Sequence, residues 1–186
     1  MADPPEIFGM HENSNISLQR AESDAVTNTA LSIQPRDSGK SGGKSPDEFV
    51  REVVEKIQEQ LPLVLTMQEA HASTFMKDKN GLMESLATFL GQEMSRFNKL
   101  LRTMDRSLSD TIKAIKGIIV MSPELDAMYQ AILNNQIPPN WMKVGYPSLK
   151  PLGSWVSDLL KRVTFIRDWL TQGKPIAYWL ASFFFP

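Results

Sequence analysis

The chain has 186 residues, which is about the length of one ordinary domain with its own core. Its 20 basic and 21 acidic residues leave a formal net charge of −1, so no global field draws it to nucleic acid or to an anionic membrane. The absence of cysteine excludes a disulfide framework and thiolate chemistry, and it suits the cytoplasm.

Residues 1–15 are predicted to be an irregular leading segment without a targeting signal. Pro4, Pro5 and Gly9 interrupt regular structure, and prolines and acids stand where a secretory signal has a basic patch and an apolar run. A helix N-cap is expected among residues 13–15. A thin apolar stripe then predicts a helix over residues 16–33, which Pro35 ends.

Residues 36–45, RDSGKSGGKS, predict a flexible loop because they are rich in glycine, serine and lysine and contain no apolar residue. Gly43-Lys44-Ser45 looks like the end of a phosphate-binding loop, but that motif requires a glycine five residues before Gly43, where Ser38 stands. No buried strand is predicted before it. A nucleotide-binding enzyme that uses residues 42–45 is therefore a disfavoured alternative.

Ser45 and Glu48 predict a helix start. Ser45-Pro46-Asp47-Glu48 places serine at the N-cap, proline at the first helical position and glutamate at the third, so the two side chains can bond backbone amides reciprocally. This helix carries an apolar face and reaches Pro62. Residues 63–72 are expected to be irregular or to form one short helical turn, and residues 77–81 to form a solvated connection. Residues 16–80 therefore hold two helices.

A long helix is predicted over residues 81–120. Apolar residues recur there every three or four positions without an intervening proline, and a helix of that length is on the order of 55 Å long. It needs other helices to cover its apolar face, which consists of Leu86, Leu90, Met94, Phe97, Leu101, Met104, Leu108, Ile112, Ile115 and Ile119. The methionines are expected to fill the core.

Two further helices are predicted after the long one. Ser122-Pro123-Glu124 predicts the start of the first, which ends near residue 134. The second covers residues 152–170 and is closed by Gly173. Between them, residues 138–151 are expected to form an ordered loop that plugs Trp141, Tyr146 and Leu149 against the bundle.

The tail after Gly173 is too short to span a bilayer, since only eleven residues run from 176 to 186. Three consecutive phenylalanines there predict an exposed apolar patch. The fold class is therefore predicted to be all-α, an elongated array of about five helices. Residues 81–186 are expected to form a long helix plus a helical bundle that lacks a following part of its domain.

Four blocks of sequence resemble dynein heavy chains, most closely the axonemal ones. They are FGMHENSNI at residues 8–16, LGQEMSRFNKLL at 90–101, YPSLKPLGSW at 146–155 and YWLASFFFP at 178–186. The resemblance implies the helical first half of the C-terminal domain, which packs on the AAA+ ring after the sixth AAA+ module and is followed by a β-rich half. Ser14 stands where that family usually has alanine.

The resemblance implies a structural and coupling role in an ATP-driven, minus-end-directed microtubule motor of the ciliary axoneme. Its implied partners are the AAA+ ring and other dynein subunits, with the microtubule reached only through the parent motor. ATP and Mg would be bound elsewhere in that parent, so no catalysis, cofactor or metal is expected in this segment, and no binding to nucleic acid or membrane. A free-standing helical adaptor that binds a partner through residues 152–186 is the alternative.

Few residues are candidates for a site. Gly9, His11 and Asn13 lie in a block that the resemblance places at a module boundary, so a structural role is expected for them, and His71 is expected to be exposed. Trp155 and Trp169 are expected in the core. The predicted interface to the ring or to the missing half consists of Trp141, Tyr146, Trp179, Phe183, Phe184 and Phe185.

Overall fold

A computed structural model describes residues 19–20, 23–24, 26–27 and 45–184. The protein divides into two parts, Met1–Gly42 and Gly43–Pro186, which are treated separately. In the first part the described residues are helical, which agrees with the helix predicted over residues 16–33. The predicted leading segment, with Gly9, His11 and Asn13, lies outside the described residues, as do residues 36–44 of the predicted loop.

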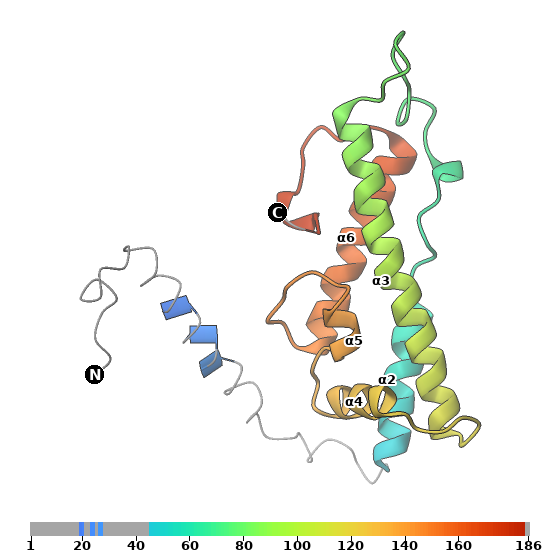
Figure 1. The fold of residues 1–186 in the computed structure, drawn as a ribbon, viewed down its shortest axis with the longest axis vertical. Coiled ribbons are helices and arrows are strands. Elements are labelled where there is room, and N and C mark those ends of the chain that lie inside the picture. Colours follow the sequence, from blue (N-terminus) through green and yellow to red (C-terminus); the bar gives the residue numbers. More distant parts are fainter. Residues whose placement is uncertain (1–18, 21–22, 25, 28–44, 185–186) are drawn as a thin grey trace. The chain divides into compact units, whose positions relative to one another are not determined.

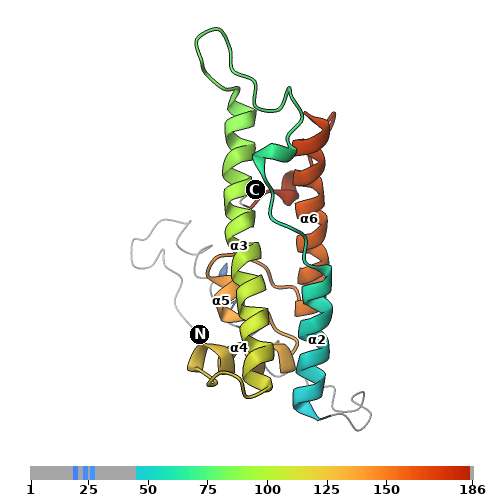
Figure 2. The ribbon, with the colours of Figure 1, turned by 90° about the vertical axis from the view of Figure 1, so that its right-hand side faces the viewer.

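The second part is built from helices, as predicted. Within residues 45–184 there is no strand, and the single isolated bridge joins Lys77 to Met83. The elements in sequence order are α2 (Pro46–Gln60), η2 (Met67–Glu69), α3 (Ser85–Ile115), α4 (Pro123–Leu133), α5 (Pro139–Met142), α6 (Leu152–Gln172) and η3 (Leu180–Ser182) (Figure 1). Helices α2, α4, α5 and α6 all contact α3 (Figure 2). None of the described helices is long and apolar enough to cross a membrane.

The start of α2 confirms the predicted capping box. The Glu48 amide donates to Ser45 Oγ at 3.2 Å, and the Ser45 amide donates to Glu48 Oε2 at 3.1 Å. These two bonds satisfy backbone donors that the first helical turn leaves without partners. Helix α2 ends at Gln60, before Pro62, and buries Val50, Val54 and Ile57.

Helix α3 is shorter than predicted at both ends. Asp78 Oδ1 accepts from the amides of Asn80 and Leu82, both at 2.8 Å, and this turn keeps residues 81–84 out of the helix. At the other end Gly117 has a φ of 71°, and the Ile118 amide donates to the Lys113 carbonyl at 2.9 Å, which closes the helix. The remaining 31 residues span about 46 Å.

The core lies along α3 and is covered by the other helices. Helix α3 buries the apolar positions from residue 90 to 108 that were predicted to face inward. Helix α6 buries all eight predicted apolar positions, and Gly173 ends it with a φ of 91°. These eight are Leu152, Trp155, Val156, Leu159, Val163, Ile166, Trp169 and Leu170.

The segment between α4 and α6 plugs the core as predicted, except at one residue. Trp141 and Tyr146 are buried, and the Trp141 indole Nε1–H donates to Ser107 Oγ at 2.8 Å. Leu149 was also expected to be buried, but 58% of its surface is exposed. The side chain of the next residue, Lys150, points toward α6 and bonds to Asp158, while the Leu149 side chain faces solvent.

Candidate functional site

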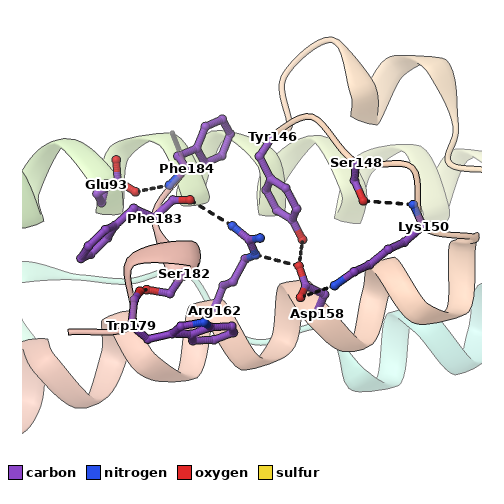
Figure 3. A network of polar contacts seen from close by, with 10 residues as sticks. All are labelled: Glu93, Tyr146, Ser148, Lys150, Asp158, Arg162, Trp179, Ser182, Phe183 and Phe184. Atoms are coloured by element: carbon purple, nitrogen blue, oxygen red, sulfur yellow. Dashed lines mark hydrogen bonds and ion pairs between the residues drawn. The ribbon is translucent and has the colours of Figure 1, made fainter. Parts of the chain in front are cut away.

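One peptide unit of the tail is held from two sides. The Phe184 amide donates to Oε2 of Glu93 on α3 at 2.6 Å. The Phe183 carbonyl accepts from Nη1 of Arg162 on α6 at 3.0 Å. These are the N–H and the C=O of the same trans peptide, which point in opposite directions. We call Glu93, Arg162 and this peptide the tail clamp (Figure 3).

Glu93 is the buried acid of the tail clamp. Its side chain has no exposed surface, and its second oxygen, Oε1, accepts from Arg96 Nη1 at 2.9 Å. An isolated buried carboxylate is very costly, so it persists only when hydrogen bonds or an opposite charge satisfy it. Glu93 has both, since the tail amide occupies one oxygen and the guanidinium the other.

Arg162 is held by a second acid. Its Nε donates to Asp158 Oδ2 at 2.7 Å, and its Cζ lies 4.0 Å from the centre of the Tyr146 ring. Asp158 also accepts from Lys150 Nζ at 2.7 Å and from the Tyr146 hydroxyl at 3.2 Å (Figure 3). The Arg162 side chain is therefore held in one orientation by contacts that do not involve the tail.

These contacts shift two pKa values. Burial opposes ionisation of Asp158, but hydrogen bonds from Lys150 and Arg162 outweigh burial and hold its pKa below the ordinary value. Burial, together with the negative charge of Asp158, raises the pKa of the Tyr146 hydroxyl. At neutral pH the cluster therefore holds an ionised acid and a neutral tyrosine.

The two phenylalanine rings of the tail fill the space between α3 and α6. The Phe184 ring meets Phe97 edge-on at 5.4 Å between centroids. The Phe183 ring meets Phe89 of α3 at 4.9 Å and Phe165 of α6 at 6.2 Å. Such edge-to-face pairs stabilise beyond the area that they bury. The clamp and these rings together tie the tail to both long helices.

The family model of the C-terminal domain of dynein heavy chains matches residues 20–186. The protein belongs to this family. It is 50% identical to human dynein axonemal heavy chain 6 over 186 residues, which is 100% of its own length and 4% of that relative. It is 44% identical to mouse dynein axonemal heavy chain 1 and 40% identical to mouse dynein axonemal heavy chain 3, over 99% and 97% of its own length and 4% of each relative.

The resemblance to axonemal dynein heavy chains is thus confirmed for the whole sequence. This dynein C-terminal segment spans about 4% of the length of those relatives. Because the similarity to heavy chains covers all of it, a free-standing adaptor is not favoured.

The structure buries four of the predicted interface residues, and their interface role stays a prediction. Phe183 and Phe184 were expected in an exposed patch, but both are buried in this dynein segment's own core. Trp141 and Tyr146 are buried as well, and each stacks on Trp155. A side chain enclosed by its own helices leaves little surface for a partner. Phe185 lies outside the described residues.

Among the predicted interface residues that the structure describes, Trp179 keeps an exposed surface. Its side chain is 39% exposed and its ring meets Phe165 edge-on at 6.4 Å. Ile176 and Leu180 beside it in the tail are also exposed. An interface role for Trp179 stays a prediction.

Other predicted residues lie apart from the clamp. Ser45 and Glu48 cap α2 in the way described above. His71 is exposed, as predicted, and its Nδ1 lies 2.7 Å from Ser73 Oγ. Among the residues that the structure describes, no group of three or more acidic or histidine side chains could hold a metal ion.

Sequence reasoning missed the residues of the tail clamp. Glu93 stands three residues after Leu90 and four before Phe97, so helical geometry places its carboxylate on the apolar face. An acid at such a position signals a buried partner. Asp158 and Arg162 are four residues apart on one helix, which predicts an ion pair, but their spacing does not reveal that the arginine reaches the tail.

Proposed function

We propose that this protein is a bracing and coupling segment of an axonemal dynein heavy chain. The proposal rests on its similarity, over its whole length, to axonemal heavy chains. In the parent, ATP-driven minus-end-directed movement along microtubules is carried out by other parts, which bind ATP and Mg. This segment performs no catalysis and reaches the microtubule only through that parent, in the ciliary axoneme.

The tail clamp is the observation that carries the coupling role. A displacement applied to the tail reaches α3 through Glu93 and α6 through Arg162, because both helices grip the same peptide. The two helices are themselves packed into one core along their length, so little of the displacement is lost in side-chain rearrangement.

The partner proposed for this segment is the AAA+ ring of the motor, together with other dynein subunits. The exposed surface of the tail supports this, since Ile176, Trp179 and Leu180 present apolar area to solvent just before the clamp. Tryptophan is among the residues that contribute most when interfaces form. The clamp would then hold this contact surface in a fixed position on the helices.

The experiment is made in the full-length heavy chain. We expect that Glu93→Ala combined with Arg162→Ala lowers microtubule gliding velocity at least twofold while ATP turnover per motor changes less, because the tail no longer transmits movement. The matched control is Glu59→Ala with Arg102→Ala, which removes the same residue types from exposed positions on α2 and α3. Equal velocity and equal turnover in the two double variants would refute the coupling role.

A further inference from the structure

A hollow of about 430 Å³ opens beside the first half of α3, and its lining includes Arg96, the partner of Glu93 of the tail clamp. Met67, Phe75 and Met83 form one wall, and they belong to the connection between α2 and α3, which runs alongside α3 (Figure 2). The floor is α3 itself, through Ala87, Gly91 and Ser95 among others. We call this hollow and its wall the methionine groove.

The wall of the methionine groove is fixed in place by hydrogen bonds. The Asn98 side chain bonds both backbone groups of Leu65, accepting from its amide at 2.7 Å and donating to its carbonyl at 2.8 Å. Further along, the His71 amide donates to the Leu170 carbonyl at 2.9 Å. The connection is therefore tied to α3 and to α6, and the hollow between the connection and α3 is preformed.

The floor of the groove suits a second helix. Ala87, Gly91 and Ser95 are spaced by four residues, so they form one row along α3. A Cβ atom added at Gly91 would meet no atom of another part of the protein within 4 Å. Ser95 Oγ donates to the Gly91 carbonyl at 2.9 Å, so its hydroxyl already has a partner. A row of small residues beside an apolar wall lets another helix approach closely.

Large apolar side chains stand exposed at the rim. Met67 is 63% exposed and Met83 is 39% exposed, and Leu82 on the neighbouring turn is 66% exposed. Methionine is flexible and polarisable, so it adapts to the shape of a partner's side chains. Met67 and Met83 also line the hollow, so their exposed apolar surface adjoins it.

The charges around the groove are unbalanced in favour of lysine. Of the acids there, Glu84 is neutralised by Lys174 at 2.8 Å, whereas Glu69 and Asp78 keep their charge because Thr66 and the turn amides are neutral donors, so three lysines face two uncompensated acids. In the described part of the sequence no ion pair is formed by three nearby cations, Lys77, Lys79 and Lys99. A partner that covers the groove is therefore favoured if it brings carboxylates.

We propose that the methionine groove docks an acidic amphipathic helix of a partner protein. One large apolar side chain of that helix fills the hollow, its apolar face lies on the row at Gly91, and its carboxylates face Lys77, Lys79 and Lys99. The concave shape favours a helix over a membrane, since a bilayer surface does not fill a hollow of this size. Recognition of this kind belongs to the helix-in-groove mode.

The test uses the complete 186-residue protein and a defined probe. The probe is an 18-residue fluorescein-labelled peptide with leucine at helical spacing and glutamate elsewhere, and its twin carries lysine in place of every glutamate. Fluorescence anisotropy should give the glutamate peptide at least tenfold tighter binding than the lysine twin. The difference should shrink between 50 and 500 mM salt, because screening weakens exposed charge pairs.

Two variants locate the binding. Gly91→Leu fills the hollow and should weaken binding of the glutamate peptide at least tenfold. The matched control is Gly153→Leu, which also places leucine on an open helical glycine but on α6, and it should bind like the unmodified protein. Lys77→Glu with Lys79→Glu should weaken binding tenfold with an unchanged melting temperature.

Three results would overturn the proposal. The first is equal binding of the glutamate peptide and its lysine twin, and the second is equal binding by Gly91→Leu and Gly153→Leu. The third is binding of phosphatidylserine vesicles that Gly91→Leu abolishes, with no binding of either peptide, since the groove would then recognise a membrane.

Discussion

Replacing Glu93 with glutamine tests the tail clamp with little change in shape. The carboxylate accepts from two donors, the Phe184 amide on one oxygen and Arg96 on the other. A glutamine has one acceptor oxygen, and its NH₂ group would face the remaining donor. One of the two donors therefore loses its partner in Glu93→Gln.

The free energy of unfolding lost in Glu93→Gln depends on which donor is left buried without an acceptor. An unsatisfied buried amide costs about 1–3 kcal/mol, and bonds to a neutral acceptor are weaker than bonds to a charged one. Arg96 is 42% exposed, so water can satisfy part of its loss, and the desolvation cost of the carboxylate disappears. We expect a net loss of about 2 kcal/mol, which lowers the melting temperature by about 4–8 °C at this length.

The assay combines a thermal melt with amide hydrogen exchange of a peptide that covers residues 178–184. Because the clamp acts on the tail, local opening there should become about 30-fold more frequent, while amides at the exposed ends of α2, which open without the tail, should exchange as before. Glu59→Gln makes the same chemical change at an exposed position and should leave both measurements unchanged. If Glu93→Gln melts within about 1 °C of the unmodified protein with the same tail protection, the clamp does not hold the tail.

Three further substitutions address other contacts. Ser45→Ala removes the capping box, so it should cost about 1 kcal/mol in a urea titration, and an unchanged midpoint would contradict the cap's role. Tyr129→Phe removes the bond from the Tyr129 hydroxyl to Asp47 at 2.5 Å. Burial and Asp47 raise the pKa of Tyr129 to about 12, so the unmodified protein should lose stability between pH 10 and 12, and the variant should lose less. Asp158→Asn should cost about 3 kcal/mol at pH 7. Since the pKa of Asp158 is lowered, the stabilisation that its carboxylate provides is present above about pH 4 and disappears as the pH falls further. The melting temperature of Asp158→Asn should therefore fall less than that of the unmodified protein when the pH is lowered below about 4.

Local chemistry explains which parts of the fold could be predicted. The capping residues Ser45 and Ser122 and the closing Gly173 act within one helical turn, so the sequence shows both partners of each interaction. Helical periodicity likewise identified the buried face of α6. The C-terminal end of α3 was predicted too late in the sequence. The apolar periodicity continues past Gly117, whereas the backbone leaves the helix through that glycine's positive φ.

The position of the tail could not be predicted in this way. Phe183 and Phe184 lie at the end of the sequence, and the rings that enclose them come from Phe89 and Phe97 on α3 and from Phe165 on α6. Local sequence rules cannot tell whether a run of aromatic residues is exposed or is buried between helices that are distant in the sequence. Only the packing of α3 against α6 decides that these rings are buried.

The blocks that carry the resemblance to dynein contain the residues that join the elements together. Glu93 and Asn98 of block 90–101 hold the tail and the connection between α2 and α3, and Tyr146 of block 146–155 supports the arginine that grips the peptide of block 178–186. Caps and apolar stripes specify helices in any helical protein. A buried glutamate that faces a tail amide is specific to this packing, so a block that contains it is more distinctive than an apolar stripe.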